Sequence, residues 1–366
     1  MSIIIFLIIL ALLILVHEFG HFIVAKKSGI RVDEFGLGFP PKIFSKKWGG
    51  TLYTLNAIPF GGFVKIFGED SHSESILPED RSTSFYYKPK YIQAAVLVAG
   101  VFFNILFAWV LISLGYSIGI PSPVKHPGYG EVGNIHLVVT EVMTDSPAQK
   151  AGLKTGDYMK TIVSGATTLD ESNMSPENVQ NIISEIKTKN IEVTYVRGND
   201  APKTVSIEPN ENIVPGKRAI GIAMGKIGIL KLPIHLAVID GARTTYFLTK
   251  ATAVGLVSFL GNAILFKSDF SQVSGPIGIA GVVGEATKLG FTYIISITAL
   301  ISINLAIINL LPFPALDGGR LLFTIIEAIR RKPISPKFVR NANFIGFAIL
   351  LLLMVVVSAH DLFKLF

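Results

Sequence analysis

The chain has 366 residues, half of them apolar, with 25 phenylalanines, no cysteine and a formal net charge of +7. Without cysteine, neither disulfides nor thiolate metal sites can form, which leaves His, Asp and Glu as the metal-binding side chains. The positive charge lies in loops that flank apolar runs, a distribution typical of a membrane protein, so we expect a lipid bilayer and no nucleic acid as partner.

The first element is an apolar run from Ile3 to Val24, long enough for a membrane helix, which needs about 20 apolar residues. Its ionisable side chains are His17, Glu18 and His21, in an H-E-x-x-H pattern. Residues four apart share one helix face, so both imidazoles can bind one zinc ion, with Glu18 as general base for a water molecule. A charge at the centre of such a helix costs about 2.5–3.5 kcal/mol, and a metal would compensate for it.

An alternative role for Glu18 is an ion pair with a buried Lys or Arg on another membrane helix. No other strongly apolar segment carries an obvious basic residue at its centre. The metal interpretation is therefore favoured over a structural ion pair.

Residues 35–67 contain strand-like pieces. Thr51 to Ile58 mixes β-branched, aromatic and apolar residues, and Gly62 to Phe67 follows a Pro-Phe-Gly-Gly turn. This pattern predicts a β-hairpin between the first membrane helix and the next.

Further apolar runs bring the predicted number of membrane helices to about four; they cover residues 92–120, 291–312 and 344–359, the last extended backward to about Asn341. A weaker run, 234–266, contains charged residues, and its uninterrupted apolar part is short for a span. It predicts an interfacial or partly embedded amphipathic segment. We therefore expect an N-terminal membrane part, a water-exposed domain and a C-terminal membrane part at residues 1–120, 125–225 and 230–366.

The charges of the loops predict the orientation in the membrane. Segment 25–91 has ten Lys and Arg and segment 320–340 has six, whereas segment 121–231 has twelve basic and twelve acidic residues. The positive-inside rule places the first two segments in the cytoplasm and the third outside. His17 and His21 then lie in the cytoplasmic half of the first span.

A third metal ligand is expected at Asp317, where the run 291–312 ends in Pro312-Phe313-Pro314 and two glycines follow the aspartate. The prolines stop the helix, and the glycines let the backbone turn, so a carboxylate is presented near the end of a span. A catalytic zinc commonly has three protein ligands and an open position. The alternative is that Asp317 caps a helix that starts near Gly318. The other histidines (72, 126, 136, 235 and 360) lie in loops, in the outside domain or near a chain end, so none is a better ligand.

With the first span and this proline-rich segment together, the chain resembles the site-2 protease family of intramembrane metalloproteases, in particular the bacterial regulator-of-sigma-E protease type. Other segments match the same group: Phe35 to Pro41, Pro59 to Lys65 and Gly275 to Ala280. The second span departs from the family in Ala99-Gly100-Val101, where Pro commonly follows Gly. A second departure is size, because one extracytoplasmic module is expected here and some relatives carry two.

The resemblance implies that His17, His21 and Asp317 bind Zn²⁺ and that Glu18 activates the water. Asn309 falls on the asparagine of the family's N-x-x-P-x-P-x-L-D-G motif. It would hydrogen-bond the substrate or the developing oxyanion, or it would be a packing amide within the membrane.

The resemblance also implies that residues 35–67 form a membrane re-entrant β-loop. A transmembrane helix cannot be cut while its carbonyls are bonded within the helix, and a free strand edge could hold an unwound segment by β-augmentation. An ordinary cytoplasmic hairpin is the alternative.

Residues 125–225 resemble a PDZ domain. Ser146 to Asp157 is similar to the SPAxxAGLxxGD segment of bacterial PDZ domains, and a helix at 176–187 and a strand at 191–197 would follow. Residues Tyr129 to Val139 are expected to form the peptide-binding loop and strand, but this loop lacks a GLGF sequence. Peptide contact and a steric filter over the active site are both open roles.

We therefore expect a polytopic α-helical membrane protein with a membrane-associated β-loop and one extracytoplasmic α/β PDZ domain, in a bacterial inner membrane. It would be an intramembrane zinc endopeptidase that cuts single-span membrane proteins, such as anti-sigma factors or signal-peptide remnants, in regulated intramembrane proteolysis. The alternatives are a membrane-tethered PDZ scaffold with a structural metal and a metallohydrolase that acts on lipids or small amides.

Overall fold

A computed structural model describes residues 2–69, 76–124, 128–185, 189–198, 200–214, 217–265 and 275–363. The chain forms two compact units. One, here called the helical unit, contains Met1–Ile112, Gly241–Gly284 and Ile297–Phe366, and the other, the sheet unit, contains Ser113–Asp240 and Glu285–Ser296.

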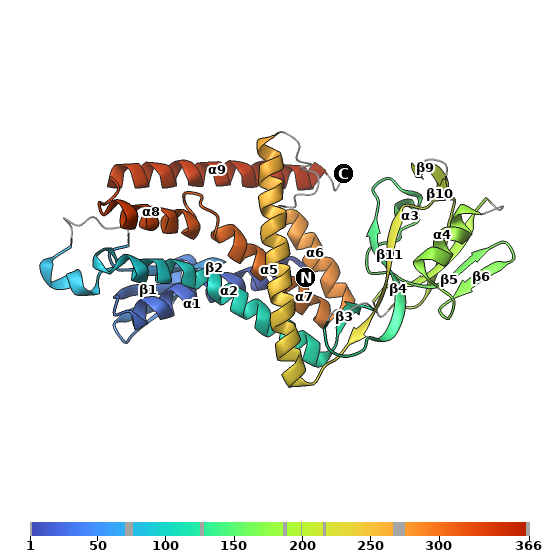
Figure 1. The fold of residues 1–366 in the computed structure, drawn as a ribbon, viewed down its shortest axis with the longest axis horizontal. Coiled ribbons are helices and arrows are strands. Elements are labelled where there is room, and N and C mark those ends of the chain that lie inside the picture. The colour runs from blue at the N-terminus through green and yellow to red at the C-terminus, as the bar shows by residue number, and fades with distance from the viewer. Residues whose placement is uncertain are drawn as a thin grey trace. The chain divides into compact units, whose positions relative to one another are not determined.

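Long helices make up most of the helical unit (Figure 1). In chain order they are α1 (Ser2–Lys27), α2 (Lys90–Ile118), α5 (Ile234–Ile264), α6 (Pro276–Leu289), α7 (Phe291–Asn309), α8 (Asp317–Arg330) and α9 (Pro336–Phe363), with short 3₁₀ helices at Pro78–Thr83 and Phe85–Tyr87. Parts of α2, α5, α6 and α7 belong to the sheet unit.

Four helices among the described residues are long and apolar enough to cross a membrane: α1, α2, α7 and α9. They correspond to the four predicted runs. The last helix begins at Pro336 rather than near residue 341, because proline at the first helical position has a suitable φ and loses no hydrogen bond there. Helix α5 covers the weaker run as one helix of 31 residues and is not among these four.

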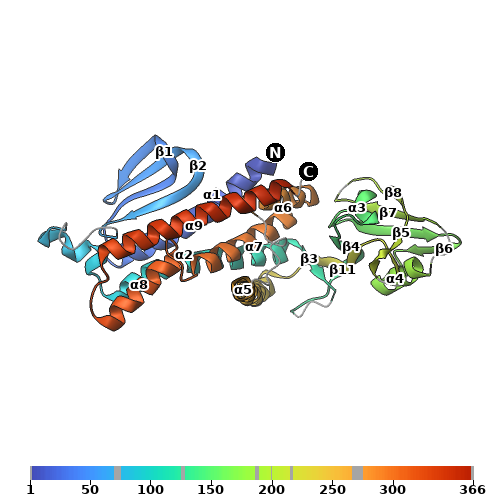
Figure 2. The same ribbon diagram turned by 90° about the horizontal axis from the view of Figure 1, so that it is seen from above.

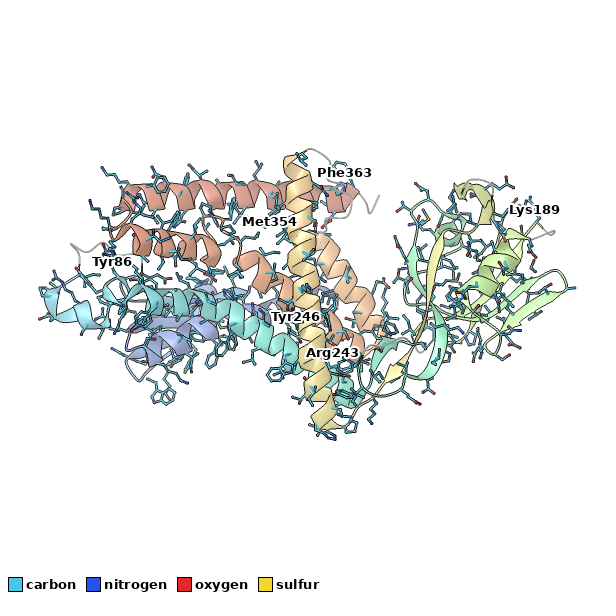
Figure 3. The ribbon with its side chains drawn as sticks, viewed as in Figure 1. Tyr86, Lys189, Arg243, Tyr246, Met354 and Phe363 are labelled. Carbon is cyan, nitrogen blue, oxygen red and sulfur yellow. The ribbon has the colours of Figure 1, made fainter. Side chains whose placement is uncertain are left out.

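The outer surface of α9 is strongly apolar. Only 6% of its most apolar stretch is buried within the protein. Large side chains such as Met354 and Phe363 are exposed there, as is Tyr246 on α5 (Figure 3). Such a surface suits contact with lipid chains, because soluble proteins rarely expose large contiguous apolar patches.

A small sheet lies beside α1 in the helical unit (Figure 2). Its strands are β1 (Val32–Trp48) and β2 (Thr51–Ile66), which confirms strand structure in this region. The two predicted pieces, except for Phe67, both fall within β2, which continues through the Pro-Phe-Gly-Gly segment where a turn was expected. Residues 34–37 pair on both sides, with 62–65 and with 52–55, while 42–48 pair with 51–56. The paired residues therefore leave two outer edges, 42–48 and 62–66.

The sheet unit is built on antiparallel strands: β3 (Ile120–Pro123), β4 (Gly133–Val142), β5 (Tyr158–Ser164), β6 (Thr167–Asp170), β7 (Ile191–Val196), β8 (Lys203–Ile207) and β11 (Ile222–Leu230). Their order is β3-β11-β4-β5-β7-β8, and β6 pairs with β5. Helices α3 (Pro147–Lys150) and α4 (Pro176–Ser184) and a hairpin of β9 (Asn210–Val214) and β10 (Lys217–Ala219) complete it. The predicted helix at 176 and strand at 191 are both present.

A buried ion pair holds the segment that resembles SPAxxAGLxxGD. The Asp157 carboxylate has no solvent exposure and accepts hydrogen bonds from Arg197 Nε at 2.6 Å and Nη2 at 2.7 Å. It also accepts from the backbone N–H of Lys154 at 2.8 Å. The hydrogen bond to Asp157 raises the pKa of Arg197, so the guanidinium remains charged.

Candidate active site

Helix α1 presents the three residues of the H-E-x-x-H pattern. His17 and His21 are each 6% exposed, and their ring centroids are 4.8 Å apart. The four-residue spacing places both rings on the same face. Glu18 lies between them and is half-buried.

Asp317 reaches this pair from α8. Its Oδ2 lies 2.9 Å from His17 Nε2 and 3.3 Å from His21 Nε2, and the two Nε2 atoms are 3.2 Å apart. Helix α7 ends at Asn309, and the proline-rich segment folds back before α8 begins at Asp317. A Cβ at Gly319 would lie 2.6 Å from the carbonyl carbon of Phe313, so this tight return requires glycine.

The alternative role of Asp317, as the cap of a helix that starts near Gly318, is wrong. The N-cap of α8 is Leu316, and no side-chain hydrogen bond caps this helix. Asp317 is instead the first helical residue, and its carboxylate faces the two histidines.

In the part of the chain that the structure describes, His17, His21 and Asp317 form the one cluster of His, Asp and Glu that could hold a metal ion. Zinc bound tetrahedrally at about 2.0–2.1 Å holds its ligand atoms about 3.3 Å apart. The separations of 2.9–3.3 Å between these three atoms fit that requirement. Two imidazoles and one carboxylate are also a common donor set of catalytic zinc sites, with one position left open.

The far ring nitrogen of His21 is held by the backbone. His21 Nδ1 lies 2.8 Å from the carbonyl oxygen of Val96 in α2. Because a carbonyl can only accept, Nδ1 carries the proton and donates it, and the lone pair of Nε2 faces Asp317. Histidines that bind metals usually have such a second partner.

The carboxylate of Glu18 lies beside the sheet of β1 and β2. A Cβ at Gly62, on the 62–66 edge, would come within 3.7 Å of Glu18 Cγ. Among the described residues, no lysine or arginine forms an ion pair with Glu18. The described residues therefore offer no basic partner for Glu18, as the alternative of a structural ion pair would require.

Asn309, the last residue of α7, is also near the histidines. Its Nδ2 lies 3.5 Å from His17 Nε2. The amide is thus next to the nitrogen that faces the cluster, where it could meet a reacting group. Three of the other histidines, His136, His235 and His360, lie in β4, α5 and α9 and take no part in the cluster, whereas His72 and His126 fall outside the described residues.

Helix α2 contributes two residues that the sequence did not single out for the site. A Cβ at Gly100 would lie 2.6 Å from His17 Cε1, so only glycine lets α2 approach both rings. One turn later, Asn104 Nδ2 lies 3.3 Å from His17 Nδ1. A glycine and an asparagine four residues apart in an otherwise apolar span were a signal that could have identified this face.

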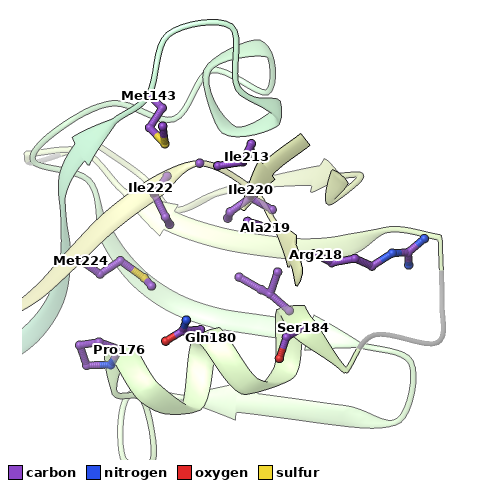
Figure 4. A pocket seen from close by; sticks show the side chains of 12 residues that line it. Met143, Pro176, Gln180, Ser184, Ile213, Arg218, Ala219, Ile220, Ile222 and Met224 are labelled. Atoms are coloured by element: carbon purple, nitrogen blue, oxygen red, sulfur yellow. The ribbon is translucent and has the colours of Figure 1, made fainter. Parts of the chain in front are cut away.

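The sheet unit contains a separate groove of about 300 Å³ (Figure 4). It lies between α4, which contributes Gln180 and Ser184, and the start of β11, which contributes Ile222 and Met224. The expectation that residues 129–139 form a peptide-binding loop and strand is not met for this groove. Residues 133–142 form β4, which pairs with β11 on one side and β5 on the other and so lies inside the sheet.

Comparisons with known proteins identify the family. The family model described as Peptidase family M50 matches residues 5–353. A putative zinc metalloprotease of Clostridium perfringens, CPE1693, is 35% identical over 364 residues, which cover 99% of this chain and 98% of the relative. The regulator of sigma-W protease RasP of Bacillus subtilis is 31% identical over 442 aligned positions, which cover 100% and 99%. A putative zinc metalloprotease of Nostoc, all3971, is 33% identical over 354 residues, with 96% and 93% covered.

The match covers both the H-E-x-x-H helix and the segment that presents Asp317. The relatives align over nearly their whole length, so the similarity is not confined to one part of this chain. The chain therefore belongs to peptidase family M50, the site-2 protease family, and is a zinc-dependent metalloendopeptidase.

Proposed function

We propose that His17, His21 and Asp317 hold the zinc ion and that Glu18 is the general base of peptide hydrolysis. The observation that carries this assignment is the convergence of three ligand atoms, 2.9–3.3 Å apart, from α1 and α8. Zinc, when bound, polarises the scissile carbonyl and lowers the pKa of a water molecule to about 7.

Glu18 takes the proton of the attacking water and passes it to the amide nitrogen that leaves. A half-buried carboxylate beside the metal ligands suits this role, because no lysine or arginine of the described ranges forms an ion pair that would hold its negative charge in place. Asn309 donates a hydrogen bond to the oxygen on which negative charge develops, for which its Nδ2 faces the cluster. The alternative for Asn309 is a packing amide at the end of α7.

The substrate is a transmembrane segment of a single-span membrane protein. Its helix must unwind before its carbonyls can react, and the 62–66 edge of the small sheet can pair with the extended segment. This edge is suited to the task because Gly62 lies beside Glu18, so a strand added there would pass close to the general base.

The active site works towards the cytoplasmic side of a bacterial inner membrane, and residues 125–225 lie outside. The excess of Lys and Arg in segments 25–91 and 320–340 supports this orientation. Helix α5 lies at the membrane interface, as its mixture of charged and apolar residues suggests.

Residues 125–225 form a PDZ domain that filters substrates by size or contacts them. The groove between α4 and β11 supports the proposal that this domain binds an extended peptide, because Met143, Ile222 and Met224 give it an apolar lining. A size filter would explain why the substrate is cut within the membrane only after an earlier cut has removed its outside domain. The three parts of the chain are then 1–120, 125–225 and 230–366.

Two classes of substrate fit this activity. One is a membrane-anchored protein that controls transcription, such as an anti-sigma factor, and the other is a signal-peptide remnant. The first suggestion is supported by the name of the Bacillus subtilis relative, which regulates sigma-W. We propose the same kind of regulated intramembrane proteolysis for this chain.

The decisive experiment incubates the purified full-length protein in nanodiscs with a panel of single-span substrates. We expect one cut within or near the transmembrane segment, inhibition by a zinc chelator, and recovery with added zinc. Cleavage of lipid or small amide substrates, but of none of the peptides, would favour the metallohydrolase alternative. Peptide binding without any hydrolysis in the zinc-loaded protein would favour a scaffold with a structural metal.

A further inference from the structure

One face of α2 packs against the rings of His17 and His21. Val96, Gly100 and Asn104 are spaced four residues apart, so they form one stripe along the helix. The carbonyl oxygen of Val96 accepts a hydrogen bond from His21 Nδ1–H, Gly100 gives room to both rings, and Asn104 contacts His17 Nδ1. Gly20 of α1 allows this helix to lie close to α2, because a Cβ at Gly20 would lie 2.5 Å from the carbonyl oxygen of Ala99.

Asn104 is held firmly in this position. It has no solvent exposure, and its backbone carbonyl accepts a hydrogen bond from Ser302 Oγ of α7 at 2.8 Å. Its Oδ1 is buried and has no hydrogen-bond partner among the residues that the structure describes. A buried amide in an apolar span costs free energy unless its polar atoms are hydrogen-bonded.

The orientation of this amide depends on the proton of His17. If Nδ2 donated to Nδ1, then Nδ1 would have to be unprotonated, and a neutral ring would carry its proton on Nε2. That proton would point at His21 and Asp317 and would block Nε2 as a ligand atom. A half-turn of the amide, which exchanges atoms of nearly equal size, lets Oδ1 accept from Nδ1–H instead. In either orientation one of the two amide atoms lacks a partner. The position of the proton on the His17 ring therefore determines which orientation is adopted.

We infer that Asn104 is a positioning residue of the metal site, with Oδ1 accepting a hydrogen bond from His17 Nδ1–H. This contact fixes the ring and the tautomer in which the Nε2 lone pair faces the cluster. It is the counterpart of the backbone contact between His21 and Val96, but it depends on a side chain. The inference rests on the proposed role of His17 as a zinc ligand.

The test compares Asn104→Leu, which removes the acceptor, with Asn104→Asp, which restores it. Both are made in the full-length protein in nanodiscs, and Ser113→Ala is the control, because Ser113 is a buried polar residue of α2 without a contact to the histidines. Zinc affinity is measured by competition with a chromogenic chelator, and the geometry of the site by the visible absorption spectrum of the cobalt-substituted protein. Unfolding of the zinc-free proteins monitors the fold.

We expect Asn104→Leu to weaken zinc binding about 10- to 100-fold and to alter the cobalt spectrum. Asn104→Asp should keep affinity within a few-fold of wild type, since a carboxylate also accepts from Nδ1–H, and Ser113→Ala should bind as wild type. If Asn104→Leu does not fold without zinc, Asn104→Ala takes its place, and the comparison with Asn104→Asp is unchanged.

Unchanged zinc affinity and cobalt spectrum in a folded Asn104→Leu protein would overturn the inference. A loss of zinc affinity in Asn104→Asp as large as in Asn104→Leu would also overturn it. Such a result is expected if the amide has only a packing role, because a buried carboxylate cannot take over that role. His17→Ala separates this failure from that of the proposed site. Full zinc affinity in His17→Ala would refute the ligand assignment itself, whereas its loss together with intact binding in Asn104→Leu would refute only the role of Asn104.

Discussion

Asp317 Oδ2 lies 2.9 Å from His17 Nε2, although the two residues are 300 positions apart in the chain. The contact joins the first helix to the short helix that follows the proline-rich segment. A metal held by both residues would tie the N-terminal and C-terminal membrane parts together. Loss of the ion should therefore weaken the link between these two parts as well as stop the reaction.

Asp317→Ala should lose zinc and activity together. Two nitrogen ligands remain, and a site with one ligand fewer binds far more weakly, so we expect at least about a 10- to 100-fold drop in zinc affinity, the size seen for lesser changes around metal sites. Metal analysis of the purified protein and a cleavage assay measure both quantities. Asp200→Ala, which alters an exposed carboxylate, is the control. Full metal content with lost activity would contradict a ligand role for Asp317.

Glu18→Gln should keep the metal and lose the reaction. The amide has the shape of the carboxylate but cannot take a proton, and general-base catalysis contributes about 10²–10⁴-fold. Zinc stoichiometry and single-turnover cleavage are measured on the same preparation, with Glu79→Gln as a control at an exposed position. A Glu18→Gln protein that cleaves at a rate near wild type would remove Glu18 from the mechanism.

Single cysteines can establish the orientation, since the native chain has none. Ser172, in the sheet unit, and Lys46, at the tip of the small sheet, are both exposed. In intact cells, an impermeant maleimide should label Ser172→Cys from outside, and Lys46→Cys only after the membrane is opened. The reverse pattern would overturn the topology.

The filter role predicts the effect of removing residues 125–225. The ends of this cut are already close, because the backbone N of Val124 lies 3.2 Å from the carbonyl oxygen of Lys226 and β3 pairs with the end of β11. A short flexible linker should therefore join them without strain on the metal ligands. We expect short substrates to be cut as before and substrates with a bulky outside domain to be cut more readily.

The outcome also distinguishes filter from docking site. If the deletion stops cleavage of short substrates while zinc content is retained, the domain is a required docking site. Met224→Lys, which places a charge in the groove but leaves the domain present, is the matched variant for peptide contact. A filter predicts no change in cleavage of short substrates by Met224→Lys.

Asp157→Asn should destabilise the sheet unit. The substitution leaves Arg197 without its charged partner beside a fully buried position, and breaking a buried ion pair costs about 3–5 kcal/mol. Limited proteolysis of the full-length protein across a urea series measures the stability of this unit. Glu208→Gln is the control, because its pair with Lys189 is exposed and such pairs contribute about 0–1 kcal/mol. Equal effects of the two substitutions would contradict the structural role of Asp157.

The sequence by itself determined the membrane helices and the local patterns of the site. Long apolar runs identify spans because an unpaired backbone cannot cross a bilayer, and the spacing of His17 and His21 identifies a helix face. The prolines before Asp317 predicted where a helix ends, whereas the two glycines after it lie in the first turn of α8 and not in a turn of the chain. The histidine spacing and the proline pattern each extend over about one or two helical turns of sequence, and an apolar run over about six, so all of these signals are local.

Only the tertiary structure decided which distant residues meet. No local pattern reveals that Asn104 lies against His17 or that Gly62 lies beside Glu18, since those contacts depend on how α2 and the small sheet pack on α1. The same holds for the groove in the sheet unit, which is lined by β11 and not by residues 129–139. Strand pairing is set by packing of the whole sheet, so residues that look equivalent in sequence can lie at its edge or inside it.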